Sequence, residues 1–116
     1  MPRLALLVVV LQIALEPSAR ADETWRNDYP TAARAEYVFA CMGANGQTRE
    51  MLAKCSCSID LIASRIPYEK YVQAETILRM QQVPGERTAA FRSAPLLTAL
   101  VAGLRDVQAE STLRCF

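Results

Sequence analysis

The chain has 116 residues, of which 13 are Lys or Arg, 12 are Asp or Glu and none is His. This even charge balance, without a basic stripe, argues against nucleic-acid binding, because affinity for nucleic acid depends on neutralising phosphates. Without histidine the chain also lacks the commonest general base, so we expect a protein that is not an enzyme.

The N-terminal segment has the pattern of a secretory signal peptide. Arg3 supplies a positive charge, residues 4–15 are almost entirely apolar, and Ala19 and Ala21 are the small residues that precede a cleavage site. The apolar run is shorter than the ~20 residues that a membrane-spanning helix needs. We therefore predict a signal peptide over residues 1–21, cleaved after Ala21, and a mature chain that does not bind membranes; the alternative is an uncleaved membrane anchor.

The mature chain is expected to begin with a loose arm and a first helix. Residues 22–29 are polar and lack apolar periodicity. Pro30 suits the first turn of a helix, and Asp28 could cap that turn. The Gly-Ala-Asn-Gly sequence at 43–46 is a stop signal, so this helix should end near Met42. Its expected buried side chains are Tyr37, Ala40 and Cys41.

The second helix, predicted from about Gln47 to Arg65, has the clearest pattern in the chain. Its apolar residues recur every three or four positions, as in the buried stripe of a packed helix: Leu52, Cys55, Ile59, Ile62 and Ile66. Pro67 then starts a third helix, predicted over residues 68–82. The expected buried face of this third helix consists of Tyr71, Ala74, Ile77 and Leu78, with Tyr68 nearby.

Two further helices are expected after the Val-Pro-Gly turn at 83–85. A short one covers residues 86–92, and a long one begins at Pro95 and runs to Cys115. The long helix carries a wide apolar stripe: Leu96, Leu97, Leu100, Val101, Leu104 and Val107. No segment alternates as a strand would, so the sequence predicts an all-α fold, a compact bundle of four to five helices in one domain over residues 30–116.

The four cysteines are Cys41, Cys55, Cys57 and Cys115. An even number in a small exported chain is typical of a disulfide framework, which here means two disulfides. On one helix, Cys55 and Cys57 point ~200° apart, so each should pair with a cysteine elsewhere. Two pairings stay open, 41–55 with 57–115 and 41–57 with 55–115. We favour the first, because Cys41 lies just before the turn into the second helix.

Two further groups of side chains are candidates for a binding site. The carboxylates Asp60, Glu50, Glu75 and Glu69 could converge on a calcium or lanthanide ion, with a second copy of the chain completing the site. The alternative is that they lie on solvated helix faces. Tyr68 and Tyr71 share one helical face, where they could either pack in the core or bind a partner.

The later part of the chain resembles a known group of proteins. The resemblance rests on Cys55-Ser-Cys-Ser-Ile-Asp60, Tyr68-x-x-Tyr71, Ala74-Glu75-Thr76, Arg79-Met80 and Gly85-Glu86-Arg87. It is to small exported helical proteins associated with quinoprotein methanol or alcohol dehydrogenases of Gram-negative methylotrophs, and it covers Cys41 to Phe116. The resemblance implies a periplasmic location and dehydrogenase neighbours that use calcium or a lanthanide. It includes no catalytic motif, and it assigns no metal-binding residue.

Three functions are therefore considered. The leading hypothesis is a periplasmic, non-enzymatic accessory or binding protein with a protein partner, serving a quinoprotein dehydrogenase system. The second is a periplasmic carrier of a lanthanide or calcium ion, which uses carboxylates and could be a homodimer. The third is a thiol redox protein, in which Cys55 and Cys57 would be reactive.

Overall fold

The computed structural model describes residues 27–116, and the helices there follow the predicted order. They are α1 Thr31–Asn45, α2 Arg49–Arg65, α3 Tyr68–Gln81, the 3-10 turn η3 Glu86–Thr88, α4 Ala89–Ser93 and α5 Pro95–Cys115. This part of the chain contains no strand, so the all-α prediction is confirmed. The predicted signal peptide and residues 22–26 of the predicted arm lie outside the described residues.

The helix ends differ from the predictions by a few residues. Helix α1 continues past Met42 to Asn45, whose side-chain amide donates to the Cys41 carbonyl. It stops at Gly46, which has a φ of 119° that suits glycine. Helix α2 begins two residues later than predicted, because Thr48 is its N-cap and accepts a hydrogen bond from the Met51 amide.

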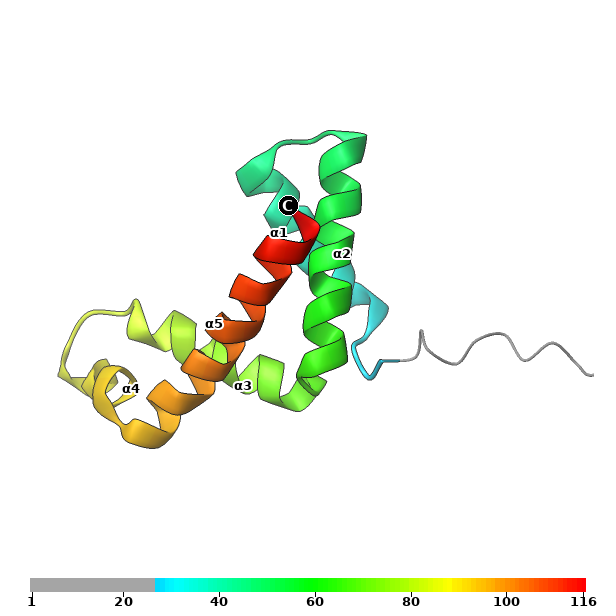
Figure 1. Ribbon diagram of the computed structural model, residues 1–116. Coiled ribbons are helices and arrows are strands. Elements are labelled where there is room, and N and C mark those ends of the chain that lie inside the picture. Colours follow the sequence, from blue (N-terminus) through cyan, green and yellow to red (C-terminus); the bar gives the residue numbers. More distant parts are fainter. Residues whose placement is uncertain (1–26) are drawn as a thin grey trace, which may run out of the picture.

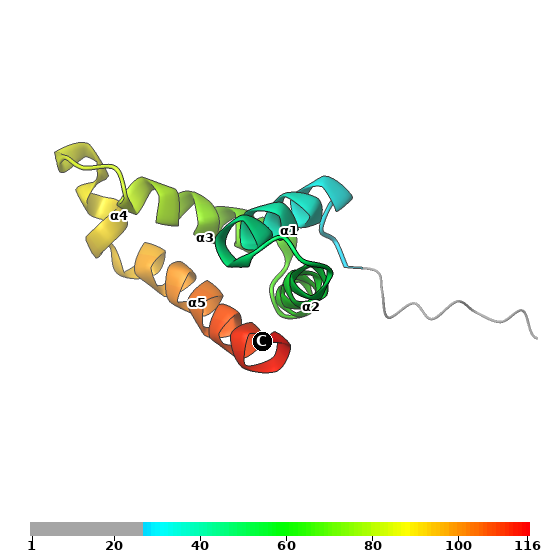
Figure 2. The same cartoon turned by 90° about the horizontal axis from the view of Figure 1, so that it is seen from above.

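Helix α2 lies at the centre of the bundle. It packs against α1 and against α5, and α5 also packs along α3 (Figure 1). The view from above shows α2 almost end-on, with α1 and α5 beside it (Figure 2). The short helix α4 lies at the opposite end from the α1–α2 turn and contacts α3 and α5. The end of α5 therefore returns to the part of the molecule where α1 and α2 meet.

The core forms where the stripes of α2, α3 and α5 meet. Its largest fully buried side chains are Ile59, Ile62 and Leu104, each at most 2% exposed. Ala74 and Ile77 of α3 and Val101 of α5 are also buried. Three predicted core positions are wrong, because Leu52, Ala40 and Leu96 are exposed. These three lie outside the α2, α3 and α5 contact, on α1 or in the first turn of a helix.

The last residues of the predicted loose arm are held by α2 and α3. Tyr29 is 4% exposed, and its hydroxyl donates to the Ile66 carbonyl at 2.9 Å. Its ring packs on those of Tyr68 and Tyr71, with centroids 5.1 and 5.2 Å away. Asp28 accepts a hydrogen bond from the Tyr68 amide, so it caps α3 and not the first helix. For residues 27–29, the predictions of a loose arm and of a cap on α1 are therefore wrong.

Candidate functional site

A groove of about 730 Å³ lies between α1, α3 and α5. Its volume falls in the range of ~300–1,000 Å³ that small-molecule sites usually have. Helix α1 contributes Ala33, Tyr37 and Ala40, and α5 contributes Gln108 and Ser111. The groove is therefore built from helices that are far apart in the sequence, and α2 adds Ser58 to its lining.

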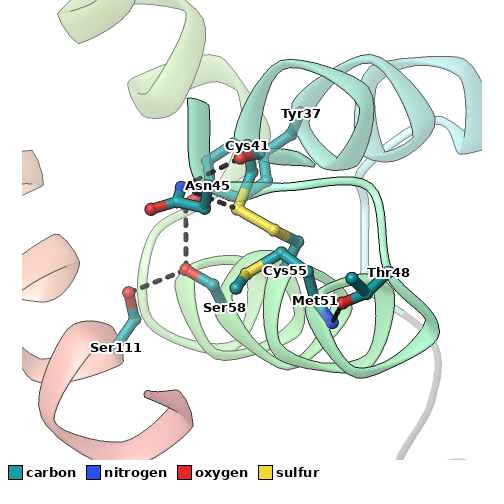
Figure 3. Close-up of a disulfide and its surroundings, with 8 residues drawn as sticks. All are labelled: Tyr37, Cys41, Asn45, Thr48, Met51, Cys55, Ser58 and Ser111. Carbon is teal, nitrogen blue, oxygen red and sulfur yellow. Dashed lines mark hydrogen bonds between the residues drawn. A yellow bond between two sulfur atoms is a disulfide. The ribbon is translucent and has the colours of Figure 1, made fainter. Parts of the chain in front are cut away.

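Three of the residues that line the groove, Tyr37, Ser58 and Ser111, form a line of hydroxyl groups, and we call this line the floor of the groove (Figure 3). Ser58 of α2 is 2% exposed, and its oxygen lies 2.8 Å from the Tyr37 hydroxyl and 2.9 Å from Ser111 Oγ. Ser111 donates to the Gln108 carbonyl at 2.9 Å. Because each hydroxyl has one proton to donate, the bonds must run from Tyr37 to Ser58, then to Ser111 and to that carbonyl. The line ties α1, α2 and α5 together.

Two disulfides hold the same three helices. Cys41 is bonded to Cys55, which joins α1 to α2, and Cys57 is bonded to Cys115, which joins α2 to the end of α5. The favoured pairing is confirmed, and no free cysteine remains. Both crosslinks start from α2 within three residues of Ser58. The floor of the groove is therefore fixed by covalent bonds to its neighbours on both sides.

One face of α3 forms a wall of the groove. Its residues recur at the three- and four-residue spacing of a single helical face: Tyr68, Tyr71, Val72, Glu75, Thr76 and Arg79. The other side of the helix carries Ala74 and Ile77, which are buried in the core. Helix α3 therefore supplies the core with its apolar side and the groove with an aromatic and charged side.

Three charged side chains line the groove without a partner in the described part of the chain. They are Glu36 of α1 and Glu75 and Arg79 of α3. Three ion pairs form within residues 27–116, and they join Lys54 to Glu50 and both Arg65 and Arg114 to Glu110. None of these pairs includes a charge of the groove, so each of the three charges is available to a ligand.

The charged side chains of the groove act on the pKa of the Tyr71 hydroxyl. Burial raises the pKa of its hydroxyl well above the ordinary value, and the carboxylate of Glu75 raises it further. The carboxylate of Glu36 acts in the same direction, whereas the guanidinium of Arg79 lowers the pKa. Both carboxylates therefore raise the pKa of the Tyr71 hydroxyl.

Of the binding residues predicted from sequence, three line the groove and three do not. Tyr68, Tyr71 and Glu75 face it. Glu50 pairs instead with Lys54, Glu69 accepts a hydrogen bond from Gln73, and Asp60 is half-buried elsewhere on α2; none of these three lines the groove. Among residues 27–116, no three His, Cys, Asp or Glu side chains gather as a metal ion would require. Of the four predicted metal ligands, Glu75 lines the groove, whereas Asp60, Glu50 and Glu69 lie elsewhere.

Sequence reasoning missed several residues of the groove. Ser58 and Ser111 are ordinary helix residues in the sequence, and only the packing of α2 on α5 makes them neighbours. Glu36 and Arg79 belong to different helices, so their common location is also a tertiary effect. One signal was present, since the polar stripe of α3 has the same spacing as its apolar stripe and lies opposite to it.

Comparison with protein-family models, curated proteins and solved structures gives no match for this chain. The resemblance to exported proteins of quinoprotein dehydrogenase systems therefore stays a prediction. Within the described helices, none combines the length and the apolar character that crossing a membrane would take.

Proposed function

We propose that this chain is an exported, non-enzymatic binding protein that holds a small molecule in the groove between α1, α3 and α5. The observation that carries the proposal is the groove itself, about 730 Å³ in volume. It combines aromatic and apolar walls with a few polar groups that converge on it, which is the usual composition of a ligand site. The disulfides on either side of Ser58 support a site that is formed before the ligand binds.

The arrangement of hydroxyls favours binding over catalysis. A serine nucleophile needs a base within hydrogen-bond distance of its oxygen. The two partners of Ser58 are the hydroxyls of Tyr37 and Ser111, and neither is an imidazole, a carboxylate or an amine. The line of hydroxyls therefore positions the helices without activating Ser58.

Export is supported by two observations from different parts of the chain. The first residues have a signal-peptide pattern, with an apolar run and small residues before the cleavage site. All four cysteines are in disulfides, which persist in oxidising compartments such as the bacterial periplasm. In this proposal the mature protein works in the periplasm as a folded, crosslinked carrier or sensor of its ligand.

The other functions considered from sequence have less support. Service to a protein partner such as a quinoprotein dehydrogenase rests on the sequence resemblance alone. Of the carboxylates proposed for a calcium or lanthanide carrier, Glu75 lines the groove, and the others do not. The thiol redox hypothesis requires reduction of at least one disulfide before a thiol can react.

A bulky residue inside the groove tests the proposal. Ala40 lines the groove, whereas Ala35 lies on the same helix, is exposed and does not line it. The mature chain and the variants Ala40→Trp and Ala35→Trp are screened against one library of small fragments by ligand-observed NMR. We expect fragments that bind the wild type and Ala35→Trp but not Ala40→Trp. Identical binding to both variants, or no binding fragment at all, would contradict the proposed site.

A further inference from the structure

If the groove is the binding site proposed above, its charged side chains indicate which class of ligand binds there. We infer that the ligand is a small organic cation, in which an ammonium group is carried on an apolar or aromatic body. The ammonium lies beside Glu36, Glu75 and the ring of Tyr71, and the body lies against the apolar part of the groove.

The charge of the groove favours a cation. Among residues 27–116, two carboxylates and one guanidinium line it, so the formal charge that they give the groove is negative. Neither Glu36 nor Glu75 takes part in an ion pair within the described residues, although this part of the chain forms three such pairs elsewhere. Unpaired carboxylates on two helices that line the groove, one from α1 and one from α3, attract a cation to it.

The aromatic residues favour the same kind of group. Tyr37, Tyr68 and Tyr71 line the groove, and the rings of Tyr68 and Tyr71 are 6.4 Å apart and nearly parallel. Ammonium groups bind over aromatic faces through the ring quadrupole, as in the aromatic cages that hold quaternary ammonium ligands. Tyr71 joins the two features, because the charges of both Glu36 and Glu75 reach its hydroxyl.

The rest of the groove suits an uncharged body. Ala33, Ala40, Val72 and Phe116 supply apolar surface along its walls. The hydroxyls of the floor are already bonded to one another, so they need no charged group from the ligand. A groove of about 730 Å³ holds a body larger than a simple alkylamine, for example a phenylalkyl chain.

Arg79 provides the discriminating feature. Its guanidinium lines the groove one turn of α3 beyond Glu75, and it repels a cation. A purely cationic ligand should therefore bind more tightly when this charge is removed. An anionic or zwitterionic ligand should bind less tightly, because its carboxylate would lose the one cationic partner that residues 27–116 supply to the groove.

The test uses probes that share one body and differ in charge. 4-Phenylbutylammonium is the cation, 4-phenylbutyrate is the anion, and L-phenylalanine is a zwitterion of similar size. Each is titrated into the isotopically labelled mature protein at neutral pH, and amide shifts in two-dimensional NMR give the dissociation constant and the location. We expect the cation to bind most tightly, with its largest shifts in the residues of α1, α3 and α5 that line the groove.

Charge-removing variants test the roles of the named residues. We expect Glu36→Gln and Glu75→Gln each to weaken binding of 4-phenylbutylammonium about fivefold, and Arg79→Gln to strengthen it about threefold. Glu86→Gln is the matched control, because Glu86 is exposed on η3 and does not line the groove. It should leave the dissociation constant unchanged.

Two results would overturn the inference in different ways. Tighter binding of 4-phenylbutyrate or L-phenylalanine in the groove, weakened by Arg79→Gln, would show that the ligand class is wrong while the groove remains a binding site. Binding of the cation that is the same in Glu36→Gln, Glu75→Gln and the Ala40→Trp variant would show that the groove is not the site, and the proposed function would fall with it.

Discussion

The two ends of the molecule are held together by different interactions. At one end α1, α2 and the last turns of α5 are joined by two disulfides, and we call this the crosslinked end. At the other, the end of α3, η3, α4 and the start of α5 contain no cysteine, and we call this the α4 end. The line of hydroxyls belongs to the crosslinked end, and the groove extends from it along α3 as far as Arg79.

The α4 end depends on polar contacts with a loop. Arg92 of α4 donates to the carbonyls of Val83 and Gly85, at 3.1 and 2.9 Å, and also to the Thr88 hydroxyl. Gln81 donates to the Phe91 carbonyl at 2.7 Å. Apolar burial contributes less here, since Leu96 is 74% exposed.

The difference suggests a division of roles within one small domain. Polar contacts near the surface exchange with water more readily than a crosslinked core does, so the α4 end should open at a lower free-energy cost. The crosslinked end should keep its shape while the α4 end fluctuates, which keeps the α1 and α5 sides of the proposed ligand site rigid. Four predictions, in order of decreasing effect at neutral pH, test this division.

The largest effect is expected from the disulfides. Replacing Cys57 and Cys115 with serine removes the longer closed loop, with a sequence separation of 58, and should lower the free energy of unfolding by about 4 kcal/mol. Replacing Cys41 and Cys55, separated by 14, should cost about 3 kcal/mol. Urea denaturation of both double variants measures the difference. Stabilities equal to that of the wild type would mean that the crosslinked end does not depend on its crosslinks.

The next effect comes from the core. Ile62 is 0% exposed, so Ile62→Ala should lower the free energy of unfolding by about 3 kcal/mol. The matched change at the α4 end, Leu96→Ala, should cost less than about 0.5 kcal/mol, because that side chain is already in solvent. The same denaturation experiment compares them, and a similar loss in both variants would contradict the distinction between the two ends.

A smaller and local effect is expected from Arg92→Ala. The variant removes donors to the carbonyls of Val83 and Gly85 and should cost about 1 kcal/mol. Amide hydrogen exchange should accelerate over residues 84–93 while the amides of α2 keep their wild-type rates. Arg87→Ala is the control, because Arg87 is exposed on η3 and its side chain makes no hydrogen bond within residues 27–116. Faster exchange throughout α2 would contradict local opening.

The last effect is a loss of stability that is absent at neutral pH and increases at alkaline pH. Burial raises the pKa values of Tyr29 and Tyr71 above the ordinary value of 10.0. The native state therefore keeps protons that the unfolded chain releases, so stability is unaffected below about pH 10 and falls as the pH rises further. Denaturation at increasing pH measures the fall, and Tyr29→Phe should make it shallower. A slope unchanged in this variant would show that Tyr29 does not carry the effect.

The helices and the crosslinks were largely predictable from the sequence. Pro67 and Pro95 mark two helix starts, and the spacing of Cys55, Ile59 and Ile62 identifies the buried side of α2. The short turn between their helices favoured the pairing of Cys41 with Cys55 without excluding Cys57, and the structure confirms it. These features depend on residues that are close in the chain, where periodicity and helix punctuation are informative.

The groove and the burial of Tyr29 could not be predicted in this way. Tyr29 is fixed by a carbonyl 37 positions away, and Ser58 by a hydroxyl 53 positions away. Both contacts depend on how α5 and α3 cross α2, which no local pattern specifies. The exposure of Leu96 has the same origin, because the apolar stripe of α5 extends further than the helices that cover it.

The position of Cys115 also affects how the native crosslinks form. If the chain is exported N-terminus first, Cys41, Cys55 and Cys57 reach the oxidising compartment while the partner of Cys57 is still to come. An early oxidant could then join Cys41 to either of two thiols that are only two residues apart. A bond between Cys41 and Cys57 would leave the Cys55 thiol unpaired until Cys115 arrives. Maturation of this protein should therefore be faster in the presence of a disulfide isomerase, which corrects such a bond.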